Sequence, residues 1–187
     1  VTFPLVRQRE EKTYGTEAFW LQKAFDPALP AKFTRFHLFG TADALLMKGD
    51  MHCMHYEYDI PDYYIQRAGT NLESAFCAVI EPYAGTPFIA GKNFLAVADN
   101  DSDALRAVAV ALQIAADERV GRAARTDVCF ADGRPDRVRT VQVSGVGAPA
   151  SRNLDLRVSA EFACLSTDDR GVRQATLVGG TLLEAPG

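Results

Sequence analysis

The stretch YYIQRAGTNLESAFCAVIEPYAGTPFI, residues 63 to 89, holds one apolar run between two groups of turn residues. Phe76 to Ile80 reads FCAVI and is rich in aromatic and β-branched residues, with a Gly-Thr-Asn turn before it and Gly-Pro signals after it. This pattern predicts a buried strand that ends at Glu81-Pro82-Tyr83. The stretch contains no nucleophile beside a base, no phosphate loop and no set of metal ligands. It therefore indicates an architecture and not a reaction.

The composition is that of a folded globular protein. The chain has 187 residues, 48% of them hydrophobic and 24% charged, which is enough for one large or two small domains with a real core. No segment approaches the roughly 20 continuous apolar residues that a membrane helix needs. The net charge is -4 and the basic residues are scattered, which argues against a nucleic-acid partner.

The N-terminal region differs from the rest of the chain. The sequence begins at Val1, without a methionine, and shows no charged segment followed by an apolar core, so no signal peptide is recognised. Residues 1–32 are interpreted as an N-terminal segment, either a linker or first strands. Residues 33–187 are expected to form one β-sandwich domain, and we expect the chain to be a fragment of a larger multidomain protein.

Short strands separated by turns dominate the chain. Phe33 to Phe39 alternates, and Met54 to Ile60 places Met54, Tyr56, Tyr58 and Ile60 on one face, as in a half-buried antiparallel strand. Further strands are predicted at 94–98, 107–115, 127–130, 137–143, 154–165 and 174–183. Many short strands at turn intervals predict an all-β fold, an antiparallel and jelly-roll-like β-sandwich of two packed sheets with few or no helices.

One segment competes for a helix. Asp103 to Val120 is rich in alanine and leucine, which favours a helix. Against it, apolar residues stand at strict period two from Val108 to Ile114, and this spacing favours a strand. Residues 41–46 fit a short helical turn or a loop, residues 19–25 fit either structure, and residues 145–151 are expected to form a flexible loop.

The motifs resemble the C-terminal all-β region of heparinase II/III-like polysaccharide lyases. The resemblance is carried by the RAG, FCAVI, EPY and PFI elements between residues 67 and 89, and by the DVCF strand at 127–130 with the Asp132-Gly133 turn. The ATLVGGTLL strand at 175–183 closes the series. The resemblance covers residues from Phe33 to the C-terminus.

The resemblance implies a supporting role. Such lyases combine an N-terminal α/α toroid with β-sheet layers and cleave acidic polysaccharides by β-elimination. This chain is expected to be an accessory, non-catalytic domain, with no catalytic residue and no cofactor of its own. Its implied partners are the toroid of the same parent and, through that parent, an acidic polysaccharide; its implied location is the periplasm or outside the cell. The alternatives are an independent carbohydrate-binding β module and a metal-dependent jelly-roll enzyme.

Two groups of residues are candidate ligand sites. His52 and His55, beside Cys53, match soft-metal chemistry by ligand type, but residues three apart on a strand point to opposite faces, so ordinary strand or turn roles compete. An aromatic and basic group is a candidate carbohydrate platform, because aromatic faces stack on sugars and arginine binds carboxylates. That group consists of Tyr56, Tyr58, Tyr63, Tyr64 and Arg67. The competing interpretation is that these tyrosines pack the sheet.

The other polar residues have plainer interpretations. Glu81 is interpreted as a strand-end carboxylate with no second titratable group beside it. Residues 134–139 (RPDRVR) are interpreted as a solvated turn and strand edge, with contact to an anionic glycan as the alternative. The cysteines have neither metal spacing nor a dense disulfide pattern, so buried thiols are expected, with a bridge between strands left open. They are Cys53, Cys77, Cys129 and Cys164.

Overall fold

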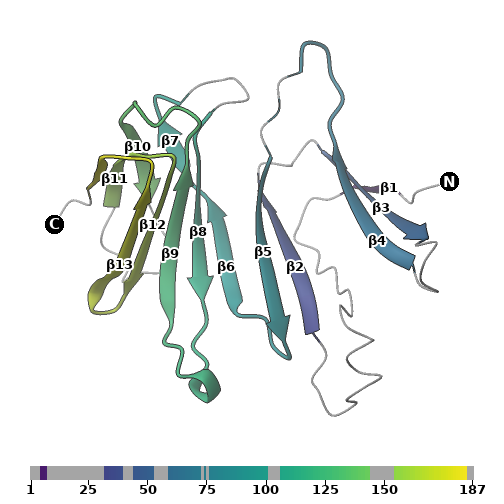
Figure 1. Cartoon of the computed structure of the whole chain (residues 1–187), viewed down its shortest axis with the longest axis horizontal. Coiled ribbons are helices and arrows are strands. Elements are labelled where there is room, and N and C mark those ends of the chain that lie inside the picture. The colour runs from purple at the N-terminus through teal and green to yellow at the C-terminus, as the bar shows by residue number, and fades with distance from the viewer. Residues whose placement is uncertain are drawn as a thin grey trace. The chain divides into compact units, whose positions relative to one another are not determined.

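The computed structural model describes residues 5–7, 32–39, 44–52, 59–72, 74, 76–100, 106–143 and 154–184 (Figure 1). Within these ranges the chain is all β, every ladder is antiparallel, and a single 3₁₀ turn takes the place of helices. The predicted fold class is confirmed. The chain divides into two compact units, residues 1–86 (unit 1) and residues 87–187 (unit 2).

Unit 1 contains two small sheets. β1 (Leu5–Arg7), β3 (Leu45–His52) and β4 (Asp59–Gln66) form one sheet in the order β1-β3-β4. β2 (Lys32–Phe39) pairs with β5 (Cys77–Ala84) in the other. β2 matches the predicted strand at 33–39. β3 lies largely beyond the segment 41–46, which was expected to be a short helical turn or a loop, and Leu45 and Leu46 of that segment belong to the strand.

β5 runs through the turn signals that were expected to end it. Glu81 pairs with Arg35 and Pro82 with Thr34, in an unbroken register that continues to Ala84. The prediction that Glu81-Pro82-Tyr83 ends the strand is wrong. Among the described residues β5 has β2 as its one strand neighbour, and an edge strand tolerates a proline because only one side of it must donate hydrogen bonds.

Unit 2 is the β-sandwich. One sheet has the order β13-β12-β9-β8-β6 and the other the order β14-β11-β10-β7. The first sheet contains β6 (Ile89–Phe94), β8 (Val108–Ile114), β9 (Arg125–Ala131), β12 (Phe162–Asp168) and β13 (Gly171–Val178). The second contains β7 (Ala96–Ala98), β10 (Arg139–Val143), β11 (Leu154–Ser159) and β14 (Leu182–Glu184).

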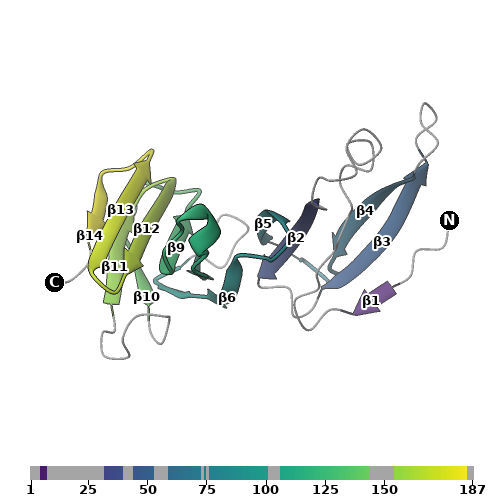
Figure 2. The ribbon, with the colours of Figure 1, turned by 90° about the horizontal axis from the view of Figure 1, so that it is seen from below.

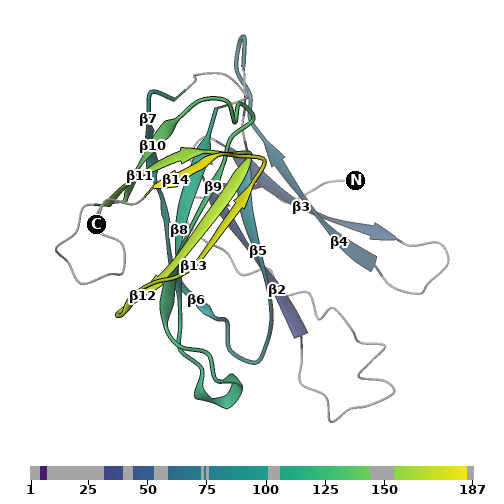
Figure 3. The same ribbon diagram turned by 60° about the vertical axis from the view of Figure 1, so that its left-hand side comes forward.

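Each of the following hairpins of unit 2 lies within one sheet, and the chain passes to the other sheet between hairpins. The hairpins β8-β9 and β12-β13 belong to the five-stranded sheet, and β10-β11 belongs to the four-stranded sheet. β9 and β12 are therefore neighbours although β10 and β11 separate them in sequence. Figures 2 and 3 show β12 and β13 as one long hairpin in the five-stranded sheet.

Small and branched side chains fill the space between the two sheets. The inner face of β8 carries alanines, and larger core residues come from β9 and from the four-stranded sheet. The core cluster is Leu95, Ala107, Ala109, Ala111, Val128, Phe130, Val141, Leu156, Val158, Ala160, Ala163 and Leu165. Val110, Leu112 and Ile114 on the other face of β8 are buried as well. The strand is thus confirmed over the helix, because apolar residues of both period-two sets are buried.

A double glycine explains two strand boundaries that the sequence did not show. The predicted strands 154–165 and 174–183 are each split, by a turn at Ala160-Glu161 and by Gly179-Gly180. Gly179 O accepts from Glu161 N at 3.3 Å, and Thr181 N donates to Ser159 O at 3.0 Å. A Cβ on Gly180 would lie 2.2 Å from Ser159 O. Only glycine lets these two turns approach so closely.

Candidate functional site

The candidate carbohydrate residues lie in and around β4 of unit 1. Tyr63 and Tyr64 are successive strand residues whose backbones pair with Lys48 and Met47. Tyr64 is exposed, and the Arg67 guanidinium donates to Ser74 Oγ at 3.3 Å. Tyr56 and Tyr58, with the greater part of the predicted strand 54–60, lie outside the described residues. The platform therefore stays a prediction.

The candidate metal residues are only partly described. The backbone of His52 ends β3 opposite Asp59, its side chain is not described, and His55 and Cys53 lie outside the described residues. Among the residues that are described, no group of three or more His, Cys, Asp or Glu side chains could hold a metal ion. In the same residues no helix has the length and apolar character needed to cross a membrane.

A buried ionic cluster joins β2 and β5. His37 Nε2 donates to Glu81 Oε2 at 2.9 Å, and both side chains are completely buried. Arg35 Nη1 lies 3.4 Å from the same oxygen, and its guanidinium stacks over the Tyr83 ring at 5.7 Å. We call Arg35, His37, Glu81 and Tyr83 the β2–β5 cluster. The interpretation that Glu81 has no titratable neighbour is wrong, because the strand register sets Arg35 and His37 beside it.

The burial of this cluster limits the chemistry that its side chains can perform. Histidine, glutamate and tyrosine are common acid and base groups, but a group must come within hydrogen-bond reach of the proton that it moves. With 0% of His37 and Glu81 exposed, a polysaccharide has no access to either side chain. Unpaired buried charges are costly, so the geometry supports a structural role for the pair. The separation of 44 residues between them explains why the sequence did not reveal it.

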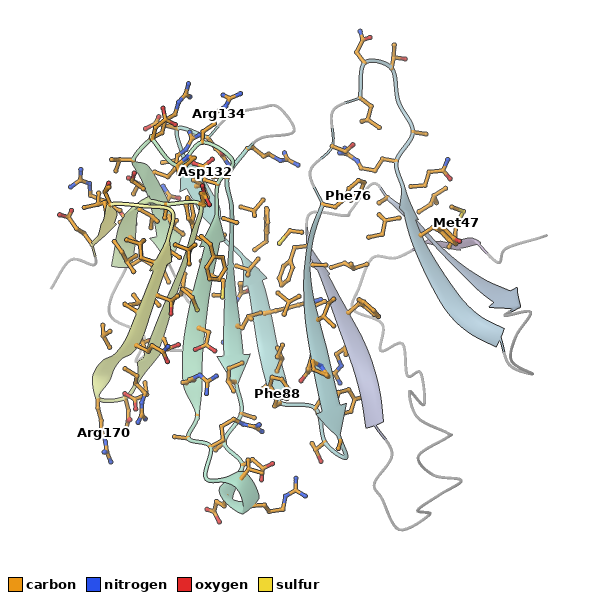
Figure 4. All side chains as sticks on the ribbon, in the orientation of Figure 1. Met47, Phe76, Phe88, Asp132, Arg134 and Arg170 are labelled. Carbon is orange, nitrogen blue, oxygen red and sulfur yellow. The ribbon has the colours of Figure 1, made fainter. Side chains whose placement is uncertain are left out.

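An open groove of about 890 Å³ lies at one end of unit 2. The β12-β13 turn and the segment that leads into β9 line it, and Figure 4 shows Arg170 at that turn. Its lining residues are Ala90, Gln113, Ile114, Ala115, Ala123, Ala124, Arg125, Thr126, Thr167, Asp168, Asp169, Arg170 and Arg173. We call it the arginine groove. It contains none of the residues predicted as sites.

Ion pairs order the arginine groove. Arg173 Nη1 lies 2.6 Å from Asp168 Oδ2, and Arg125 Nε donates to both carboxylate oxygens of Asp127 at 2.9 and 3.1 Å. The backbone N–H of Arg170 donates to Asp168 Oδ1. This hydrogen bond, and after it the positive charge of the nearby Arg173, lowers the pKa of Asp168. Arg125, Arg170 and Arg173 all line the groove, and a guanidinium group is a planar set of donors that suits a carboxylate.

The outer face of the five-stranded sheet carries exposed apolar residues. Phe162 pairs with Val178 and Ala131, and Ala131 pairs with Val108. These side chains face away from the core, because their strand neighbours Ala109, Phe130 and Ala163 face into it. We call Val108, Ala131, Phe162 and Val178 the outer apolar band; Phe162 and Val178 are 39% and 50% exposed, and Val108 and Ala131 are half-buried.

The opposite end of unit 2 contains a buried ion pair. Arg139 Nε donates to Asp132 Oδ2 at 2.8 Å, and Arg139 Nη1 donates to Asp99 O at 2.6 Å. Figure 4 shows Asp132 and Arg134 at this end, away from Arg170. The interpretation of residues 134–139 as a solvated turn is therefore wrong for Arg139, which is buried and holds the β9-β10 connection.

Comparison with protein-family models, curated proteins and solved structures finds no match to this chain.

Proposed function

We propose that this chain is an accessory, non-catalytic β-sandwich of a heparinase II/III-like lyase that acts on acidic polysaccharides by β-elimination. Its partner in this proposal is the α/α toroid of the same parent protein, and its location is the periplasm or outside the cell. The proposal rests on the resemblance of the strand and turn motifs, and the outer apolar band is the structural observation that favours it.

The outer apolar band suits a docking role better than a ligand site. Adjoining exposed apolar side chains on a sheet face, here Phe162 and Val178, are typical of a surface that another domain covers. Phe162 and Val178 are direct cross-strand neighbours, so their apolar surfaces adjoin. An acidic polysaccharide would find no charge or hydrogen-bond donor in the side chains of this band. A helical surface with apolar residues could instead pack against these side chains.

The first experiment reads the gene upstream of Val1 and measures elimination by this chain. A helical region of several hundred residues should precede Val1, and the chain alone should produce no unsaturated sugar, measured by its ultraviolet absorbance, from any acidic polysaccharide. The parent protein should produce it. A start codon next to Val1, or turnover by the chain alone, would refute the proposal.

Substitutions in the parent protein test the docking surface. Phe162→Asp should lower the stability of the parent and its elimination rate, because it places a charge in an apolar contact. Val120→Asp, on an exposed residue outside the outer apolar band, is the matched control and should change neither. In the isolated chain both variants should lower the free energy of unfolding by less than about 1 kcal/mol. Equal effects of the two variants in the parent would count against docking through this face.

A second candidate function, direct binding of an acidic glycan, is favoured by the arginine groove. Charge-assisted hydrogen bonds from arginine to a carboxylate are stronger than neutral ones, and they weaken with salt at exposed sites. Arg170→Gln and Arg173→Gln should each lower the affinity for a uronate oligosaccharide about tenfold in calorimetry, whereas the exposed Arg157→Gln should not. Equal binding of a neutral oligosaccharide would contradict this role.

A further inference from the structure

Two cysteines lie directly opposite each other in the five-stranded sheet. Cys129 on β9 and Cys164 on β12 are Cα partners in the antiparallel ladder, and their Sγ atoms are 3.4 Å apart. Both side chains are half-buried. Their strand neighbours Phe130 and Ala163 face the core, so the two thiols lie on the outer face, where small reagents can reach them.

The backbone spacing of such a pair already suits a disulfide. Directly opposite residues of an antiparallel ladder have Cα atoms about 4.5 or 5.5 Å apart, depending on the type of pair. Disulfides span Cα separations of about 4.4–6.8 Å. The two sulfur atoms must close from 3.4 Å to about 2.05 Å, which side-chain rotation and a small approach of the strands can provide.

The environment of the pair also favours reaction at one thiol. The hydrogen bond with Cys129 lowers the pKa of Cys164, so Cys164 forms the thiolate more readily. The thiolate is the nucleophile in thiol–disulfide exchange. Burial instead raises the pKa of Cys77 on β5, which makes that thiol a natural control.

We propose that Cys129 and Cys164 form a reversible cross-strand disulfide, with a low-molecular-weight disulfide such as oxidised glutathione as the oxidant. The Cys164 thiolate attacks one sulfur of oxidised glutathione, forms a mixed disulfide and releases one glutathione thiolate. Cys129 loses its proton and attacks Cys164 Sγ, which forms the Cys129–Cys164 bond and releases the second glutathione. The two protein thiols are oxidised by two electrons, the oxidant is reduced to two thiols, and the two protons go to the released glutathione.

The bond changes what holds the sheet together. β9 and β12 belong to different hairpins and are joined in sequence only through β10 and β11, so their contact is non-local. A covalent link between residues 35 apart restricts the unfolded chain and raises the thermal unfolding midpoint. Oxidation thereby adds a covalent link between β9 and β12 to the hydrogen bonds that already pair these strands.

The test oxidises the whole chain with oxidised glutathione and maps the cysteines by mass spectrometry after digestion without reductant. We expect one linked peptide that joins Cys129 to Cys164, and a thermal unfolding midpoint several degrees higher that returns to its starting value with dithiothreitol. A bridge that joins other cysteines, or glutathione adducts that persist on Cys129 and Cys164 without a bridge, would overturn the proposal.

Two cysteine variants serve as controls for the oxidation experiment. In Cys129→Ser, oxidation should stop at a glutathione adduct on Cys164 and the midpoint should not rise. Cys77→Ser should form the same linked peptide and show the same rise as the wild type. A rise in Cys129→Ser equal to that of the wild type would show that another site causes it, which is incompatible with the proposal.

Discussion

Unit 2 buries aliphatic and aromatic side chains between its two sheets, whereas the β2–β5 pair of unit 1 buries an ionic cluster. The core of unit 2 gains stability from the removal of apolar surface from water, which depends little on pairing geometry. The β2–β5 cluster must keep each charged group opposite its partner, because buried charge is stable only when it is compensated. One chain thus combines a core that tolerates exchange between similar apolar residues with a cluster in which no charged partner can be lost without cost.

The largest expected effect is the loss of a large side chain from the apolar core. Phe130→Ala should lower the free energy of unfolding of unit 2 by about 4 kcal/mol, because it removes buried apolar contacts and leaves a cavity. Phe130 is 3% exposed. Urea unfolding measures the effect. Phe162→Ala, on the outer face, is the control with an expected loss below about 1 kcal/mol; equal losses would mean that the core is not where the structure places it.

Loss of one charge from the β2–β5 cluster comes next. Glu81→Gln should destabilise the β2–β5 pair by about 3 kcal/mol, because Arg35 and His37 then lose a buried carboxylate. Hydrogen exchange of the β5 amides measures it, since the two units can open separately. Glu184→Gln breaks the exposed pair with Arg157 and should cost below about 1 kcal/mol. A smaller effect at Glu81 than at the exposed Glu184 would mean that the β2–β5 cluster does not depend on its buried carboxylate.

A substitution at the double glycine should have a smaller effect. Gly180→Ala should cost about 2 kcal/mol in unit 2, because the new methyl group meets Ser159 O and Ala160. Gly69→Ala is the matched control, as its new Cβ makes only ordinary contacts with Leu72. We expect less than about 1 kcal/mol there. If thermal unfolding shows Gly180→Ala to be neutral, the close approach of the two turns is not required.

The smallest expected effect depends on pH. The folded-state pKa of Asp168 is lowered, first by the backbone N–H of Arg170 and then by Arg173, so its ionised form stabilises the fold. This stabilisation is present above the ordinary pKa of an aspartate and is lost as the pH falls through the lowered value. Asp168→Asn should therefore be slightly less stable at neutral pH and match the wild type in acid. A difference that grows in acid would have the wrong sign.

Unit 2 was the more predictable of the two units. Its period-two runs lie at β8, β9 and β10, and the segment 103–120 forms the strand that its spacing indicated rather than the helix that its composition favoured. Burial of both faces of β8 outweighs helix propensity, which is a weak preference. The splits at residues 160 and 179 were missed because both turns lie inside apolar runs.

In unit 1 the local sequence pattern did not predict where some strands lie or which side chains are partners. β3 was missed because LLMKGDMH does not alternate between apolar and polar residues, and β5 was expected to stop at a proline that an edge strand accommodates. His37 and Glu81 are ordinary strand residues in sequence, and nothing local marks them as partners. The arginine groove was missed for the same reason, since its lining comes from four separate segments.

The fold class follows from the amino-acid sequence, because the alternation of side chains along a strand and the turn chemistry between strands are local properties of the backbone. Which strands are neighbours is known only from the folded structure. That choice places Glu81 beside His37 and Cys129 opposite Cys164, and it turns Phe162 and Val178 outward. Strand pairing joins residues tens of positions apart, and its energy comes from packing and burial of the whole sheet, which no short stretch of sequence carries.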